Sequence, residues 1–250
     1  MVAQWQTDFM WARDETLTQN MRDGTLARPP NRGESRAMAK AEVDFCFKAG
    51  HISKDDRVLV FGAGMGDFAA ALEGRVKEVV AIEPGIEQQV AKIQAALEQM
   101  GETLPDAERR QFEKILPLTG EQFVEQHPDK KFTVVIASNC HFFLPEGVDP
   151  ERAIEDTMAS MASMTDKGGK TLLGVPSTHP SIVKTMQDGQ FGSTMFQPPK
   201  VHLCSASPHF TNYRKVSGQI CFMEYPRLDP LQTGSAVQGQ GSESVERAKG

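Results

Sequence analysis

The residues with the clearest chemical pattern are Gly62, Gly64 and Gly66, which follow the apolar run 57–61 at every second position. An apolar run of this length that ends in glycine is typical of a buried strand and a tight turn into a helix. Glycine lets the backbone adopt positive φ and approach a ligand closely. The free N–H groups of the following helix point toward such a turn. We therefore expect the turn, including Ala63, to hold a nucleoside-containing cofactor.

Polar residues also follow the other expected strands. Glu83 and Pro84 follow the strand expected at 78–82, and Glu83 stands 21 residues after Gly62, where its carboxylate can accept hydrogen bonds from ribose hydroxyls. In a parallel sheet, ligands bind beyond the carboxyl ends of the strands, beside the first strand. The candidates after the third and fourth strands are Glu121, Gln122, Ser138 and Asn139.

The glycine spacing separates two classes of cofactor. A dinucleotide fingerprint, G-x-G-x-x-G, requires its third glycine at position 67. The sequence has Asp67 there, and its carboxylate would face a pyrophosphate. The G-x-G-x-G spacing instead suits a cofactor without a pyrophosphate.

Strand and helix patterns alternate along the chain, which predicts an α/β fold of the Rossmann-like, doubly wound type. We expect a seven-stranded, mostly parallel sheet with helices on both faces and one antiparallel edge strand, because the last two strands are too close in sequence for a crossover. Pro117 lies inside the third strand, which is therefore expected at an edge. The strands are expected at 57–61, 78–82, 115–118, 132–137, 170–175, 201–205 and 219–225.

The helices are expected from apolar periodicity and from their start and stop signals. The first should run from Ser35, as its cap, to Lys48, with Met38, Ala41 and Phe45 on its buried stripe. Another should end near Met164 with Ile154, Met158 and Met161 buried. The remaining helices are expected at 67–74, 86–100, 106–114, 120–127 and 180–187.

The chain ends differ from the central region. Residues 1–34, which carry both tryptophans, form either an aromatic cap on the core or a lid over a substrate pocket. Residues 35–230 form the ligand-binding domain. Residues 231–250 are rich in Gly, Gln and Ser without an apolar period and are expected to be disordered.

Composition narrows the partners and the compartment. The net charge of −6 argues against a nucleic-acid partner, and no apolar run approaches the roughly 20 residues that span a bilayer. The four cysteines form no CxxC pair, so reduced thiols, no metal and a cytoplasmic location are expected. A small-molecule substrate and a homodimer are both compatible with these features.

The chain resembles the class I S-adenosylmethionine-dependent methyltransferases over roughly residues 35–225. The matching segments follow one another in the family's order: 58–66, 79–84, 119–123, 132–144 and 168–173. The resemblance implies that Gly62 to Gly66 wrap the methionine part of S-adenosylmethionine and that Glu83 binds the ribose.

The same resemblance implies roles for the later candidates. Glu121 and Gln122 would lie near the adenine, and Ser138 and Asn139 near the sulfonium. A sulfonium methyl is already activated, so a general base is needed only if the acceptor must lose a proton. His141, just beyond the fourth strand, is the candidate base, with packing as the alternative. The candidate substrate contacts are Trp11, His209 and Tyr213.

Three functions stay open at this point. The favoured one is methyl transfer to an oxygen or nitrogen of a small molecule, with S-adenosylhomocysteine as product. A methyltransferase of RNA or protein would instead need one contiguous basic patch formed by Arg22, Arg28, Arg32, Arg36 and Lys40. A catalytically silent binding or regulatory subunit is the third, because Val60 stands where many family members carry an acidic residue.

Overall fold

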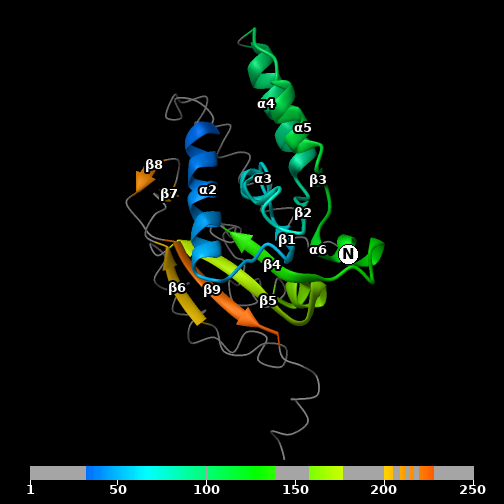
Figure 1. Ribbon diagram of the computed structural model, residues 1–250. Helices are drawn as coiled ribbons and strands as arrows, with labels where there is room; N and C mark the ends of the chain where they lie inside the picture. Colours follow the sequence, from blue (N-terminus) through cyan, green and yellow to red (C-terminus); the bar gives the residue numbers. More distant parts are fainter. Residues whose placement is uncertain are drawn as a thin grey trace, which may run out of the picture.

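The structure, a computed structural model, describes residues 32–99, 101–138, 158–176, 200–204, 209–211, 214–216 and 220–227. Its centre is a seven-stranded sheet in the order β3-β2-β1-β4-β5-β9-β6 (Figure 1). In that order the strands are Ile115–Leu116, Glu78–Ile82, Arg57–Phe61, Phe132–Ser138, Thr165–Pro176, Ile220–Pro226 and Lys200–Cys204. β7 (His209–Thr211) and β8 (Arg214–Val216) form a separate hairpin that was not predicted.

Strands β3, β2, β1, β4 and β5 form a continuous parallel block, as predicted. β9 is antiparallel to both of its neighbours, β5 and β6. The antiparallel strand was expected at the edge of the sheet, and this position is wrong. β6 forms the edge, and the antiparallel strand β9 lies between β5 and β6. β9 pairs with β5 over seven residues and with β6 over five, so its interior position satisfies backbone groups on both of its sides.

β3 lies at the other edge, as predicted, but it is shorter than expected. It contains only Ile115 and Leu116, so Pro117 follows the strand instead of lying within it. Proline has no N–H with which to continue the ladder. The carbonyl of Leu116 accepts a hydrogen bond of 3.0 Å from the backbone N–H of Glu83, and this bond ties the edge strand to the end of β2.

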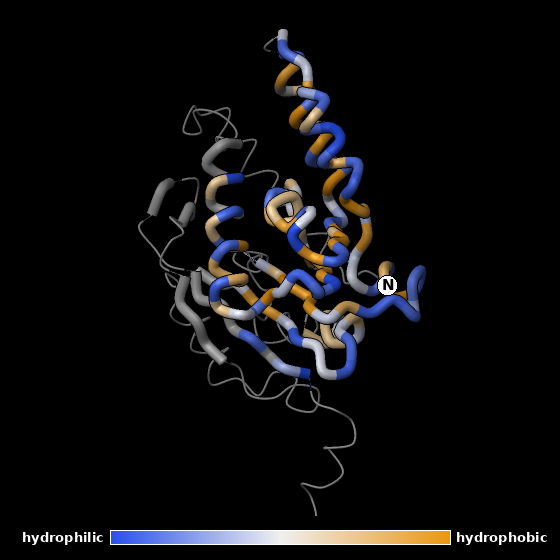
Figure 2. Tube along the Cα trace, in the orientation of Figure 1, coloured by the Kyte–Doolittle hydropathy of each residue, from blue (hydrophilic) through white to orange (hydrophobic). Residues whose placement is uncertain are grey.

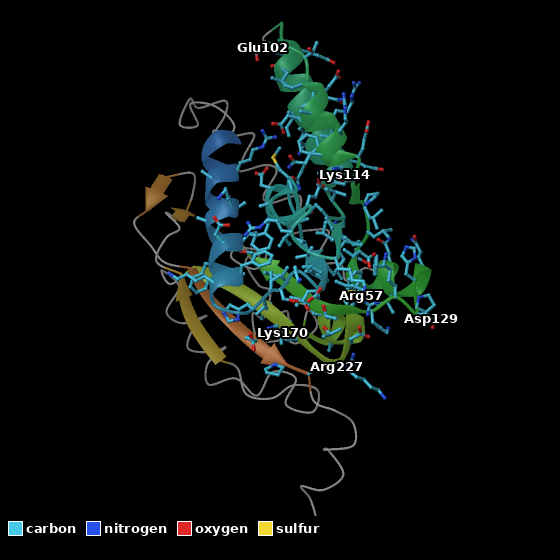
Figure 3. All side chains as sticks on the ribbon, in the orientation of Figure 1. Arg57, Glu102, Lys114, Asp129, Lys170 and Arg227 are labelled. Carbon is cyan, nitrogen blue, oxygen red and sulfur yellow. The ribbon has the colours of Figure 1, made fainter. Side chains whose placement is uncertain are left out.

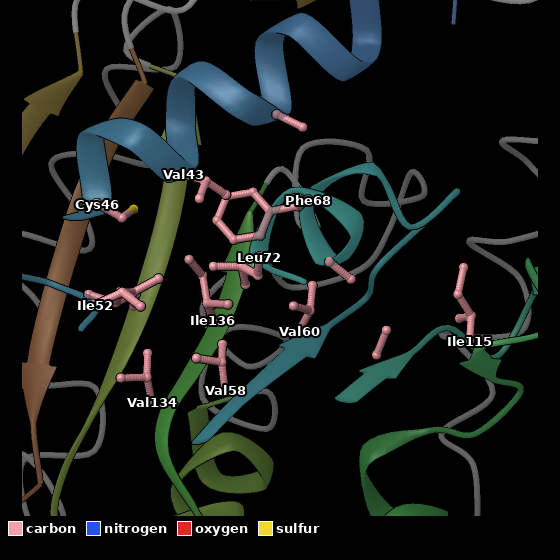
Figure 4. Close-up of a cluster of buried hydrophobic side chains, with 14 of the residues drawn as sticks. Val43, Cys46, Ile52, Val58, Val60, Phe68, Leu72, Ile115, Val134 and Ile136 are labelled. Atoms are coloured by element: carbon pink, nitrogen blue, oxygen red, sulfur yellow. The ribbon is translucent and has the colours of Figure 1, made fainter. Parts of the chain in front are cut away.

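Helices cover both faces of the sheet and enclose two apolar cores. One core includes residues of α2 and α3 together with Val58, Val60, Val134 and Ile136 (Figure 4). The other includes Phe123 of α6 and the buried residues of the helical segment 158–164, packed against the opposite face. The helices are α2 (Arg32–Lys48), α3 (Asp67–Leu72), α4 (Ile86–Gln99), α5 (Asp106–Phe112) and α6 (Gly120–Gln126).

The predictions for α2 need two corrections. The helix already includes Arg32, so Ser35 lies inside it and does not cap it. Of the predicted stripe, Ala41 and Phe45 are only partly buried, and the side chain of Met38 lies outside the described residues. The buried apolar residues of α2 are Ala39, Val43 and Cys46, so the buried stripe is rotated by about one residue. Phe45 is only partly buried against the same core, and Glu42 lies on the buried face.

Other helix predictions agree with the structure. The helical segment before β5 ends at Met164, and Met158 and Met161 are buried as core residues. Its start, with Ile154, and the helix expected at 180–187 lie outside the described residues. α4 stands away from the sheet with polar and apolar residues interleaved (Figure 2), and only its first turns reach the core through Ile86, Val90 and Ile93. Among the described helices, none combines the length and apolar character that a membrane crossing requires.

A polar cluster joins the α2–β1 connection to the sheet away from the glycine turn. His51 is 1% exposed, and its Nδ1 lies 2.6 Å from Glu224 Oε2. Lys170 (labelled in Figure 3) donates to the Gly50 carbonyl at 3.0 Å and lies 3.4 Å from the same carboxylate. The hydrogen bond from His51, supported by the charge of Lys170, lowers the pKa of Glu224 to about 2. The cluster therefore fixes β9 against the rest of the domain.

We expect Glu224→Gln to lower the free energy of unfolding by about 2–3 kcal/mol at pH 7. Because the pKa of Glu224 is lowered in the folded state, its stabilisation is complete above its ordinary value of 4.5 and is lost as the pH falls toward 2. Urea titrations should show that the difference between wild type and variant shrinks by about 2 kcal/mol between pH 7 and pH 3. Glu125→Gln, at an exposed position of α6, is the control. A difference that does not change with pH would contradict this assignment.

Candidate functional site

The glycine turn joins β1 to α3 and has the conformation that its sequence predicts. Gly62, Gly64 and Gly66 have φ angles of 62°, 54° and 77°, which lie in the left-handed region that favours glycine. Two hydrogen bonds of 2.9 Å hold the turn. One runs from the N–H of Ala63 to the Ile82 carbonyl, and the other from the N–H of Gly66 to the Ala63 carbonyl. The turn is thus fixed to the end of β2 as well as to β1.

The two sides of the turn differ in the space around them. A Cβ added to Gly64 would meet no atom within 4 Å. A Cβ added to Gly66 would lie 2.7 Å from Cδ1 of Ile115 on β3. The turn therefore packs tightly against the edge of the sheet at Gly66 and faces open space at Gly64, where a ligand can approach the backbone.

Glu83 lies at the turn, as predicted, and it also holds the turn in place. Its side chain is buried, at 8% exposure. Oε2 accepts a hydrogen bond of 2.9 Å from the N–H of Gly64, and Oε1 accepts one of 3.3 Å from Gly85, on the far side of Pro84. A carboxylate has about four lone-pair positions. Glu83 therefore keeps acceptor capacity for hydroxyl groups of a ligand.

Two residues whose contacts with the turn were not predicted support it on its covered side. Gln111 of α5 donates from Nε2 to the Met65 carbonyl at 2.7 Å and to Asp67 Oδ1 at 3.1 Å. Nη2 of Arg36 on α2 lies 2.6 Å from Oε1 of Glu108 on α5, and Nε of Arg36 lies 3.8 Å from Asp67 Oδ1. Asp67, which replaces the dinucleotide glycine, is thus used to join the turn to α2 and α5.

The residues after β3 have separate roles. Thr119 caps α6, and its backbone N–H donates to Oε1 of Gln122 at 2.9 Å in a capping box. The amide oxygen of Gln122 therefore takes part in the helix cap. The sequence had instead led us to expect Gln122 beside the adenine. Glu121, in contrast, has a buried Oε2 without a hydrogen-bond partner. A Cβ on Gly120 would lie 2.8 Å from the Phe61 ring, so the start of α6 lies against the end of β1.

Ser138, at the end of β4, lies beside the glycine turn. Val60 and Ile136 are register partners, so Gly62, which directly follows β1, and Ser138, the last residue of β4, lie at the same level of the sheet. Ser138 Oγ donates to Oε2 of Glu42 at 3.0 Å, and Glu42 is only 2% exposed. Sequence reasoning missed Glu42, although a carboxylate inside the apolar pattern of α2 was a visible signal.

The remaining predicted site residues are not placed by the structure. Asn139, His141, Trp11 and Tyr213 lie outside the described residues. His209 belongs to β7, of which only the backbone is described. The site that the structure describes is therefore formed by the carboxyl ends of β1, β2 and β4 with the first turn of α6. It lies where β1 has β2 on one side and β4 on the other, the switch point of the sheet.

Comparisons with known proteins give structural matches only. No family model matches the chain, and no curated protein sequence does. A methyltransferase from Pyrococcus furiosus is 11% identical with a TM-score of 0.47, over 74% of this chain and 82% of its own. The magnesium protoporphyrin IX methyltransferase of Synechocystis, solved with bound SAM, is 13% identical with a TM-score of 0.46, over 80% and 82%. An rRNA methylase from Streptococcus thermophilus is 14% identical with a TM-score of 0.41, over 81% and 98%. At such low similarity the functional conclusion must come from this chain's own residues.

Alanine at the two glycines should separate ligand binding from stability. Gly64→Ala places a methyl group in open space, so it should cost only the roughly 1–2 kcal/mol of left-handed backbone strain. It should nevertheless weaken binding of S-adenosylmethionine at least tenfold by blocking the approach to the turn. Gly66→Ala adds the clash with Ile115 and should destabilise the fold by about 1–3 kcal/mol more. Urea unfolding and calorimetric titration measure the two effects. Wild-type affinity in Gly64→Ala would show that the ligand does not lie over the turn.

Proposed function

We propose that this chain is an S-adenosylmethionine-dependent methyltransferase that acts on an oxygen or nitrogen of a small molecule and releases S-adenosylhomocysteine. The observation that carries the proposal is the buried carboxylate of Glu83, hydrogen-bonded to Gly64 on the open side of the glycine turn. This arrangement combines an acceptor for ribose hydroxyls with a backbone that a ligand can approach closely. The carboxylates of Glu83 and Asp67 both lie at the turn, and their negative charges disfavour a pyrophosphate there.

The described residues fit the parts of this cofactor in order. The unpartnered Oε2 of Glu121 can accept a hydrogen bond from the adenine amino group. Glu83 can accept hydrogen bonds from the ribose hydroxyls, and the open side of Gly64 leaves room for the methionine part. Ser138 would then lie near the sulfonium. Gln122 fits less well than expected because its oxygen belongs to the capping box.

When bound, the cofactor supplies a methyl carbon that its sulfonium charge already activates. The chain's own contribution is to hold the acceptor about 3–3.5 Å from that carbon and in line with the breaking bond, which can account for roughly 7–11 kcal/mol of the barrier. We assign this positioning to residues that follow β4 in sequence. His141 is proposed as the base for an acceptor that must lose a proton, and Trp11, His209 and Tyr213 as contacts of the acceptor.

A small-molecule acceptor is favoured over RNA by the charge of the described surface. Of the basic residues that could have formed a patch, Arg36 is paired with Glu108 and Lys40 with Asp44, at 2.6 Å and 2.8 Å. Basic side chains neutralised in this way are poorly suited to contact phosphates. Arg22 and Arg28 lie outside the described residues, as does the side chain of Arg32.

Calorimetric titration with S-adenosylmethionine tests the proposal. Wild type should bind the cofactor, and Glu83→Ala should bind it about 1.5–3 kcal/mol more weakly, the scale of a hydrogen bond to a charged group. Glu98→Ala, an exposed position near the end of α4, is the control and should bind like wild type. Because Glu83 also holds Gly64, circular dichroism should confirm that each variant is folded.

The possible results separate the assignments. Unchanged affinity in Glu83→Ala would reject the ribose contact. The absence of heat with wild type at millimolar cofactor would reject the methyltransferase proposal as a whole. Cofactor binding without methyl transfer to any acceptor would favour a silent regulatory subunit.

A further inference from the structure

We infer that Gln111 of α5 is a positioning residue that sets the affinity of the glycine turn for the cofactor. This inference rests on the proposed function and deepens it. Its basis is the half-buried amide of Gln111, which donates from Nε2 to the Met65 carbonyl at 2.7 Å and to Asp67 Oδ1 at 3.1 Å. Met65 belongs to the glycine turn, and Asp67 is the first residue of α3. Gln111 therefore acts on the cofactor through the backbone of the turn.

The three polar partners of the Gln111 side chain all require the same orientation of its amide. The Met65 carbonyl and the ionised carboxylate of Asp67 can only accept hydrogen bonds, so both need the NH2 group. Arg36 can only donate, and its Nη2 lies 3.3 Å from Oε1 of Gln111. The ion pair of Arg36 with Glu108, at 2.6 Å, holds the guanidinium in place. The amide is therefore fixed with its donors toward the turn.

The bond to Met65 fixes one peptide group of the turn at both of its ends. The carbonyl of Met65 accepts from Gln111, and the N–H of Gly66, in the same peptide group, donates to the Ala63 carbonyl at 2.9 Å. A planar peptide group held through both its C=O and its N–H cannot rotate without breaking these bonds. Gly66, at φ 77° and ψ 11°, needs this hold because glycine has access to many other backbone conformations.

Loss of the bond from Gln111 would let the turn populate other conformations. The apparent affinity of a ligand falls in proportion to the fraction of protein molecules in the conformation that binds it. One hydrogen bond of ordinary strength changes such a fraction by up to about tenfold. S-adenosylmethionine and S-adenosylhomocysteine share the parts expected over the turn, so Gln111 should influence the affinity for both ligands equally.

Gln111→Glu tests the inference because a carboxylate keeps an acceptor for Arg36 but has no N–H for the Met65 carbonyl. Calorimetric titrations should show that the dissociation constants of both ligands rise about tenfold. Gln111→Lys, which keeps N–H donors at the end of the side chain, should stay within about threefold of wild type for both ligands. Gln94→Glu, the same change of charge at an exposed position of α4, is the control and should change neither constant.

The two Gln111 variants separate positioning from a direct effect of charge. S-adenosylmethionine carries a net positive charge, so an added carboxylate would attract it and an added ammonium would repel it. Charge alone therefore predicts tighter binding by Gln111→Glu than by Gln111→Lys, and it predicts a smaller effect on the neutral thioether ligand. Positioning predicts the reverse order and equal effects on both ligands.

Two results would overturn the inference while leaving the proposed function in place. One is wild-type affinity for both ligands in Gln111→Glu. The other is a Gln111→Lys variant that loses affinity as fully as Gln111→Glu, which would make Gln111 a packing residue only. If circular dichroism shows that Gln111→Glu is unfolded, Gln111→Met, of similar length and without an N–H, takes its place in the same comparison. If wild type binds neither ligand, the proposed function fails first, and the inference fails with it.

Discussion

The hydrogen bond between the Glu83 carboxylate and the Gly64 N–H is the interaction on which the site depends. It connects the end of β2 to the turn after β1, and the same carboxylate holds the start of α4 through Gly85. A buried carboxylate is tolerated here because backbone N–H groups compensate for its desolvation. The turn is therefore preorganised, and a ligand that uses it does not have to order a mobile loop.

The elements outside the sheet reinforce the same turn from its covered side. Gln111 binds the Met65 carbonyl and the Asp67 carboxylate, and Arg36 brings α2 and α5 together through Glu108. This network explains how α5, which lies beyond the long α4 in sequence, contributes to a site built around β1. It also gives Asp67 a structural role and accounts for its presence where a dinucleotide-binding protein would have glycine.

Much of this architecture could be predicted from local patterns, and the exceptions have nonlocal causes. The strand at 78–82, the helix from Asp67 and the position of Glu83 follow from apolar runs and glycine spacing, which act over a few residues. The place of β9 between β5 and β6 depends on pairing between distant segments. The buried role of Glu42 depends on which face of α2 meets the sheet, and a one-residue rotation changed that face. The bond of Gln122 to Thr119 is local, but the sequence alone did not decide between capping and ligand binding.

The most direct test of this account is a crystal structure of the protein with S-adenosylhomocysteine. The account predicts that the ribose hydroxyls contact Glu83, that the amino-acid part crosses the open side of Gly64, and that the sulfur faces Ser138. The adenine should lie within hydrogen-bond reach of Glu121. A ligand bound elsewhere, or bound at the turn with its ribose away from Glu83, would contradict the account.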